Sequence, residues 1–132
     1  MMDNNLLHEV FSTEKLDDLF PKDRADVFFD ALYGDASDGA YDIFLKFKSA
    51  KKNVLQFEFQ LEQRPGKCLA CNLTYGLPEV FSRHPVINIA DLAKGIMRLL
   101  NKNTDSVRWK IGATREVSEK HHVIPLDIFH EA

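Results

Sequence analysis

The sequence predicts an α+β fold in which helices pack on one face of an antiparallel sheet of four to five strands. The first observation behind this prediction is the order of segments: two helices, three strands, a helix, and one or two further strands. The second is that short connections suit hairpins rather than crossovers, and the third is that helical and extended segments are partly segregated. Residues 1–132 are predicted to form a single domain.

Two short helices are predicted before the first strand. Ser12 and Thr13 precede acidic residues, which is typical of a helix N-terminus, and Pro21 ends that helix. Asp23 would cap the second helix, and Gly34 would follow its C-terminal end. The residues at helical spacing that would form its buried face are Val27, Phe28, Ala31 and Leu32.

The clearest strands lie in the middle of the chain. Apolar and polar residues alternate over residues 41–47 and again over residues 55–61. Residues 49–53 have the length of a hairpin loop, so the two strands are predicted to pair antiparallel. Phe44 breaks the alternation, because it lies on the polar face of the first strand. We expect a loop, a terminus or another subunit to cover it.

After the hairpin, residues 68–75 are predicted to form a third strand, which puts alternate side chains on one face. Residues 76–85 are predicted to be irregular because two prolines interrupt them. Asn88 and Asp91 have the spacing of a capping box, which opens a helix that ends near Asn101.

The C-terminal part of the chain predicts a strand over residues 107–113 and a last strand over residues 121–129. Pro125 interrupts this last strand and lacks a backbone N–H. The last strand is therefore predicted to lie at an edge of the sheet.

The composition limits the classes of function that fit this chain. Hydrophobic residues make up 45% of the chain and its net charge is −3, so the balance is that of an acidic globular protein and argues against nucleic-acid binding. No apolar stretch is long enough to cross a membrane. No signal peptide is visible either, so we expect a cytoplasmic location with reduced thiols.

Cys68 and Cys71 form a C-x-x-C motif, and His84 follows in the next loop. One hypothesis is a metal or redox site built from these three side chains. The alternative is that both cysteines are buried structural thiols, because residues three apart on a strand point to opposite faces. Cys71 with His84 is also the one pair that could act as nucleophile and base. No catalytic residue and no cofactor are assigned.

Arg64, Lys67 and Arg83 bracket the predicted third strand and could form a small anion-binding patch. The alternative is that they are ordinary basic residues of a solvated loop. Neither of the two glycine-rich phosphate-binding motifs occurs. Asp35, Asp38 and Asp42 do not have the spacing of a calcium loop and are interpreted as turn and cap residues.

Three segments resemble an uncharacterised bacterial family whose members sometimes carry the label pancreas/duodenum homeobox protein. They are residues 20–26 (FPKDRAD), 28–36 (FFDALYGDA) and 63–78 (QRPGKCLACNLTYGLP). The resemblance implies no activity. The label does not fit, because a homeodomain has three helices and a basic recognition helix. The order of elements is also similar to that of type III secretion chaperones, and this resemblance implies a dimer that holds a protein client.

Together these observations favour a non-enzymatic module that binds a protein partner, with a homodimer as a further expectation. Such a module would use a sheet edge or an apolar patch. The second hypothesis is a small metal- or thiol-dependent protein centred on Cys68, Cys71 and His84. The third is a binder of anions or small molecules that uses Arg64, Lys67 and Arg83.

Overall fold

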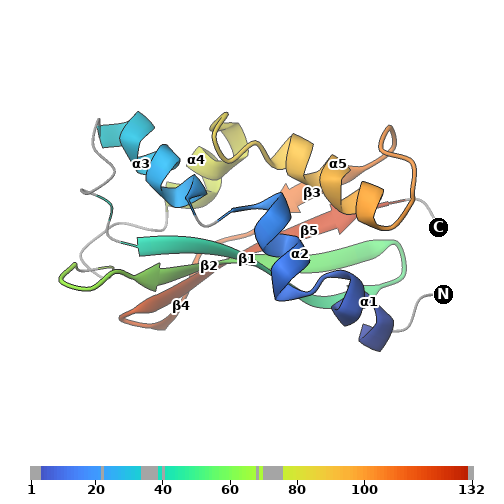
Figure 1. Ribbon diagram of the computed structural model, residues 1–132, viewed down its shortest axis with the longest axis horizontal. Coiled ribbons are helices and arrows are strands. Elements are labelled where there is room, and N and C mark those ends of the chain that lie inside the picture. The colour runs from blue at the N-terminus through green and yellow to red at the C-terminus, as the bar shows by residue number, and fades with distance from the viewer. Residues whose placement is uncertain are drawn as a thin grey trace.

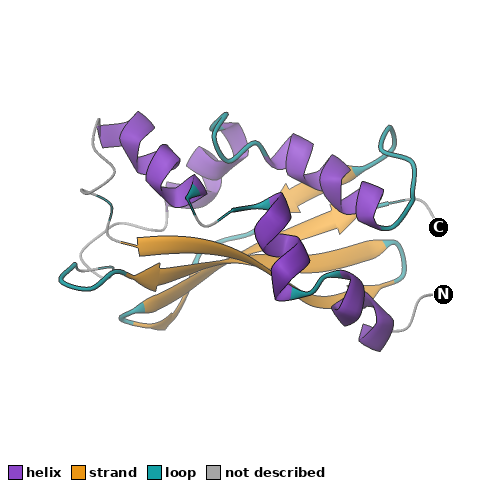
Figure 2. Cartoon of the chain, viewed as in Figure 1, coloured by secondary structure: helices purple, strands orange, loops and turns teal. Residues whose placement is uncertain are grey.

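The computed structural model describes residues 4–21, 23–33, 39, 41–67, 69 and 76–130. It confirms the α+β prediction, with a five-stranded antiparallel sheet and helices packed against it (Figures 1 and 2). The helices are α1 (Asn4–Val10), α2 (Thr13–Leu19), α3 (Arg24–Tyr33), α4 (Leu77–Arg83) and α5 (Ile89–Leu99). The strands are β1 (Tyr41–Lys51), β2 (Val54–Gln63), β3 (Arg108–Ile111), β4 (Arg115–Ser118) and β5 (His121–Phe129).

The β1–β2 hairpin forms as the alternation predicts. Its register pairs Leu45 with Phe59, and the alternating apolar residues of the two predicted segments, 41–47 and 55–61, are buried. A bulge between Phe47 and Ser49 places one extra residue, Lys48, in β1. The strands continue to a two-residue turn, so the connection is shorter than the predicted loop.

The prediction that β5 lies at an edge of the sheet is wrong. The strand order is β1-β2-β5-β3, and β4 also pairs with β5, so β5 is a central strand. The carbonyl of Pro125 accepts a hydrogen bond of 2.8 Å from the N–H of Gly112, just after β3 ends. N–H and C=O of one strand residue point to the same side. The donor that Pro125 lacks would therefore face Gly112. The reciprocal bond cannot form, so the pairing of β3 with β5 ends there, at the break between β3 and β4.

The same break shows that the strand predicted over residues 107–113 is too long. Only Arg108–Ile111 pairs with β5, and a separate strand, β4, begins at Arg115 and forms a hairpin with β5. A Cβ at Gly112 would lie 3.3 Å from Pro125, so glycine permits the close approach at this point.

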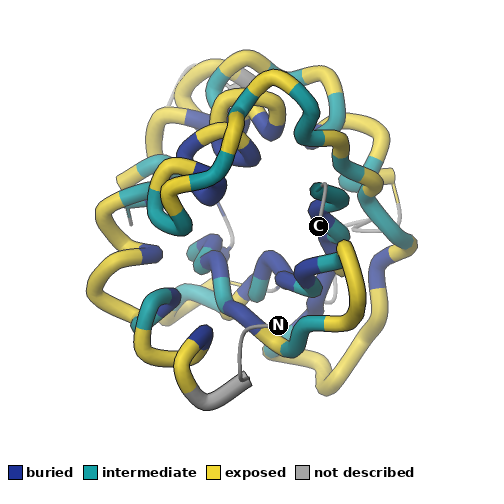
Figure 3. Tube along the Cα trace, turned by 90° about the vertical axis from the view of Figure 1, so that its right-hand side faces the viewer, coloured by how far each residue is buried: buried dark blue, intermediate teal, exposed yellow. Residues whose placement is uncertain are grey.

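The core lies between the helices and the inner face of the sheet, and buried stretches of both the helices and the strands lie around this interior (Figure 3). Phenylalanine supplies much of its volume. Phe59 of β2 lies at its centre, with its ring centroid 5.5 Å from that of Phe20 and 5.4 Å from that of Phe81. These edge-on and tilted contacts tie the sheet to two helical segments.

The predicted cap of α2 is confirmed, since the Ser12 hydroxyl accepts a hydrogen bond from the N–H of Lys15. The predicted buried face of α3 is partly wrong. Phe28 is buried, but Val27 is 50% exposed and Phe29 is buried instead. Helix α3 is rotated so that Phe29 reaches Tyr41 of β1, with ring centroids 4.8 Å apart.

The irregular segment predicted over residues 76–85 is wrong, because residues 77–83 form α4. Pro78 occupies the first turn of this helix, where the missing N–H would have no intrahelical partner. The predicted capping box of α5 is only half formed. The Asn88 side chain accepts a hydrogen bond of 3.3 Å from the N–H of Asp91, but the Asn88 N–H donates to the carbonyl of His84.

Some predictions fall outside the described residues. These are the cap at Gly34, the turn residues Asp35 and Asp38, and nearly all of the strand predicted over residues 68–75. Within that last range the structure describes Leu69, which is buried in the core and whose N–H donates to Oε1 of Gln63. Among the described helices, none is long and apolar enough to span a membrane.

Candidate interaction surface

The outer face of the sheet is the side that points away from the core. Figure 1 shows α3, α4 and α5 together on the opposite side of the strands. The two-residue period of each strand fixes which side chains point outward. Because the strands are antiparallel, one face can remain solvated, and polar residues alternate with the core residues along it.

Cationic side chains gather at one end of the outer face. Lys48 and Lys51 come from β1, and Arg108 and Lys110 come from β3, at the other side of the sheet; all four are exposed. The strand register places Lys51 and Arg108 in the same row across the sheet. Lys51 pairs with Val54, Val54 with Phe129, and Phe129 with Arg108. We call Lys48, Lys51, Arg108 and Lys110 the basic end.

The two pairs of cations flank a strip formed by β2 and β5. Strands β1 and β3 are three strand spacings apart, which is about 14 Å. The floor between them consists of Val54 and Gln56 of β2 with Asp127 and Phe129 of β5. An extended segment or one helix, about 10 Å wide with its side chains, fits this width.

Only one of the four cations has a carboxylate partner among the described residues. Nζ of Lys48 lies 3.8 Å from Oε1 of Glu58, whose side chain is largely buried on the outer face. Glu58 also accepts a hydrogen bond of 2.8 Å from Gln60. The basic end therefore carries excess positive charge although the whole chain has a net charge of −3.

A cavity adjoins the basic end where β3 and β5 meet the β1–β2 turn. Its volume is about 460 Å³, and its lining residues are Asn53, Asp105, Ser106, Val107, Arg108, Phe129 and His130. These residues come from three separate parts of the sequence. A backbone hydrogen bond of 3.0 Å from His130 to Asn53 holds two of the segments together.

Both edges of the sheet are protected against pairing with another strand. On β1, Lys46 and Lys51 flank the bulge at Lys48, and lysines and bulges are devices that block edge-to-edge pairing. At the other edge, β3 and β4 have only 4 residues each, and β4 also carries a bulge. The face of the sheet is thus a better binding surface than its edges.

Phe44 lies on the outer face, as predicted, and is half-buried by side chains of its own chain. Nζ of Lys46 lies 5.7 Å from the centre of its ring. Nearby Val123 is 1% exposed although it is not part of the main core, and its cross-strand neighbours are Gln60 and Arg115. Phe44 is therefore partly covered within its own chain and does not form an exposed apolar patch.

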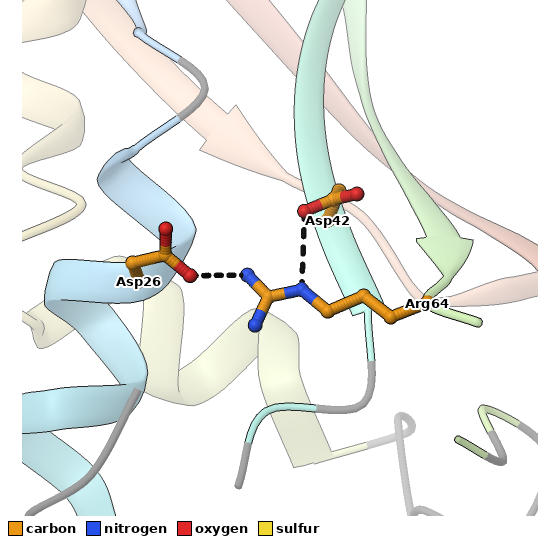
Figure 4. Close-up of polar contacts among 3 residues, drawn as sticks. All are labelled: Asp26, Asp42 and Arg64. Carbon is orange, nitrogen blue, oxygen red and sulfur yellow. Dashed lines mark hydrogen bonds and ion pairs between the residues drawn. The ribbon is translucent and has the colours of Figure 1, made fainter. Parts of the chain in front are cut away.

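Arg64, a predicted anion ligand, connects α3 to the sheet. Its Nη2 lies 2.7 Å from Oδ1 of Asp26, and its Nε lies 3.1 Å from Oδ1 of Asp42 (Figure 4). The guanidinium also lies 5.4 Å from the ring centre of Phe29. With a side chain only 16% exposed, Arg64 acts as a tertiary ion-pair bridge in this structure.

We expect Arg64→Gln to lower the free energy of unfolding by about 2 kcal/mol, because it leaves Asp42 partly buried without its cation. Arg64→Lys should lose about half as much, since one ammonium cannot hold both carboxylates in the same geometry. Urea denaturation followed by circular dichroism measures both values.

Arg83→Gln is the matched control for this prediction. Arg83 pairs with Glu79 at 2.7 Å, but both side chains are more than two-thirds exposed, at 77% and 71%. The change should cost less than about 0.5 kcal/mol. Equal losses at the two arginines would contradict the bridging role of Arg64.

The other predicted anion ligands differ in position. Lys67 shares a turn with Arg64, since its N–H donates to the Arg64 carbonyl at 3.1 Å, and its side chain is exposed. Arg83 lies on α4 with Glu79 as its partner. No hydrogen bond or ion pair of the described residues brings the three side chains together, so the anion patch stays a prediction.

Of the predicted metal ligands, Cys68 and Cys71 lie outside the described residues. His84 follows α4, and its Nδ1 accepts a hydrogen bond of 3.2 Å from the N–H of Val86. Its ring lies edge-on to Phe28 at 4.9 Å. Nowhere in the described ranges do three His, Cys, Asp or Glu side chains come together as a metal site.

Sequence reasoning missed the basic end and the cavity. Lys48, Arg108 and Lys110 do carry a weak signal, since each lies on the polar side of an alternating segment. Lys51 falls in the predicted hairpin loop, and the bulge at Lys48 brings it to the outer face. The common position of the four cations depends on β5 lying between β2 and β3, and the sequence predicted β5 at an edge.

Fold and surface together define an α+β domain with a helix-covered inner face and a charged outer face. Comparison with known proteins finds no matching family model, no similar curated protein and no similar solved structure. The resemblances that the sequence suggests therefore stay predictions.

Proposed function

We propose that this protein is a non-enzymatic interaction module that binds an acidic segment of a partner protein on the basic end of its sheet. The observation that carries the proposal is the excess of cations on one part of one face in a chain of net charge −3. Like charges placed together without internal partners destabilise a free protein slightly, and an acidic partner would relieve this repulsion.

The floor of the strip favours a protein segment over a nucleic acid. Phe129 and Val54 offer apolar contact along the strip, as the centre of a protein interface does. Asp127 and Glu58 lie among the cations, and both would repel a continuous phosphate backbone. An acidic peptide with apolar residues at alternate positions can place its carboxylates opposite the cations and its apolar side chains on Phe129 and Val54.

Fluorescence anisotropy with labelled peptides tests the proposal. The probe is a ten-residue peptide of alternating glutamate and leucine, compared with one of alternating glutamine and leucine. We expect the acidic peptide to bind more tightly, and its affinity to fall by about tenfold between about 50 mM and about 200 mM salt. The double variant Lys48→Glu, Lys110→Glu should weaken binding by at least about tenfold.

The double variant Lys15→Glu, Lys94→Glu is the matched control. It makes the same change in net charge on exposed lysines of α2 and α5, away from the outer face. It should leave affinity within about twofold, because charges more than a Debye length apart are screened. Equal weakening by both double variants would overturn the proposal.

Two further outcomes would assign the surface differently. A ten-nucleotide oligouridine that bound more tightly than the acidic peptide would make it a nucleic-acid interface. Light scattering that detected a dimer, lost in the Lys48→Glu, Lys110→Glu variant, would make it the contact between two copies of this chain. Either result would replace the acidic partner segment.

A further inference from the structure

We infer that the cavity beside the basic end binds a small zwitterion, an α-amino acid with an apolar side chain. The cavity volume of about 460 Å³ lies within the usual range for small-molecule sites, roughly 300–1,000 Å³. It exceeds what one inorganic ion would fill. This inference goes beyond the binding of an acidic segment and does not depend on it.

Two opposite charges line the cavity and are not paired with each other. Asp105 and Arg108 both contribute to its wall, yet no carboxylate oxygen of Asp105 lies within 4.0 Å of the guanidinium. Within the described part of the chain, neither side chain has another ion-pair partner. A ligand with an ammonium group and a carboxylate can satisfy both charges at once.

The positions of both charged residues are held by local structure. The N–H of Asp105 donates a hydrogen bond of 2.8 Å to Oδ1 of Asn103, which fixes the turn before β3. Arg108 begins β3 and pairs in register with Phe129 of β5. The two groups thus approach the cavity from a turn and from a strand, and neither depends on the other for its place.

The remaining wall selects the kind of amino acid. Phe129 and Val107 offer apolar surface beside Arg108, and Ser106 offers a hydroxyl. Phosphate is a poor fit, because the carboxylate of Asp105 opposes an anion and the apolar wall contributes nothing to it. An α-amino acid with an apolar side chain fits all three features. Its carboxylate would pair with Arg108, its ammonium group would reach Asp105, and its side chain would lie on Phe129.

Three related compounds test this inference by NMR titration of the ¹⁵N-labelled protein. L-phenylalanine carries both charges, N-acetyl-L-phenylalanine lacks the ammonium group, and L-phenylalaninamide lacks the carboxylate. We expect L-phenylalanine to shift the amide signals of the cavity residues, and to bind at least about fivefold more tightly than either derivative.

Variants identify the residues responsible. Arg108→Gln and Asp105→Asn should each weaken L-phenylalanine binding by about tenfold, since each removes one charge-assisted contact. Lys110→Gln, next to the cavity but outside its wall, should change it by less than about twofold. Asp105→Asn keeps the backbone N–H that bonds to Asn103, and unchanged signals elsewhere show that a variant is folded.

The inference is overturned if L-phenylalanine at about 10 mM shifts no cavity signal, if the derivatives bind equally well, or if inorganic phosphate binds more tightly. The same variants separate this site from the acidic-segment site. Lys110→Gln should weaken only the acidic peptide, whereas Asp105→Asn should weaken only the amino acid, because removal of a negative charge favours an acidic peptide.

Discussion

Replacement of Phe59 by alanine is expected to lower the free energy of unfolding by about 4 kcal/mol, the largest effect of any change considered for this protein. Phe59 is 0% exposed, and its ring contacts those of Phe20 and Phe81. Its backbone lies between Leu45 of β1 and Ile124 of β5. Since strands and helices converge on this ring, the cavity left by alanine cannot collapse easily.

Thermal and urea denaturation measure this effect, with an expected fall in Tm on the order of 15 °C. Phe44→Ala is the matched control, because Phe44 occupies the same sheet but its outer face, and is only half-buried. We expect that variant to lose less than about 1.5 kcal/mol. A similar loss at both positions would contradict the assignment of inner and outer faces.

The second large effect is expected at Gly39, where alanine should lower the free energy of unfolding by about 3 kcal/mol. A Cβ at this buried position would lie 2.1 Å from Cδ2 of Phe29, far inside van der Waals contact. The ring cannot easily move away, because Phe28 and Tyr41 hold it edge-on at 5.5 Å and 4.8 Å. Overpacking at such a site forces side chains or backbone out of place.

Gly76→Ala is the control, because a Cβ at Gly76 would have no atom within 4 Å and that residue has an ordinary helical φ of −84°. It should change stability by less than about 0.5 kcal/mol. A double-mutant cycle tests the mechanism at Gly39. In a Phe29→Leu background the ring is gone, so Gly39→Ala should cost clearly less than in the parent. An undiminished cost would show that the clash with Phe29 is not the cause.

The sequence was most informative where a single period governs a segment. The alternation over β1 and β2 identified the two strands and, up to the bulge at Lys48, their buried faces, because a residue's side of a regular strand follows from its position. The caps of α2 and α5 were equally predictable, since Ser12 and Asn88 bond to backbone groups three residues ahead.

The sequence predictions are wrong at two prolines, because each lies at a position that tolerates proline. Pro78 lies in the first turn of α4, where proline is favoured, and Pro125 faces a gap between two strands. In α3, the choice between Val27 and Phe29 as buried residue depends on contact with Tyr41, which helical periodicity does not encode.

The basic end could not be predicted from the sequence for a related reason. Lys51 and Arg108 are far apart in the sequence and become level only through the pairing of β2 with β5 and of β5 with β3. Similarly, the bridging role of Arg64 requires α3, β1 and the end of β2 to meet. Such long-range juxtapositions follow from the order of strands, and the sequence pattern leaves this order open.

The central position of β5 has a consequence for synthesis of the chain. Gln63 ends β2, and its neighbour in the sheet, β5, begins 58 residues later (121 − 63). At about 5–20 residues per second, a ribosome needs roughly 3 to 12 s to supply that strand. During this time β2, whose Phe57, Phe59 and Leu61 all become buried, has an unpaired side. The nascent chain thus exposes an aggregation-prone edge until a late segment inserts into the middle of the sheet, and chaperones that shield such edges would raise its folding yield.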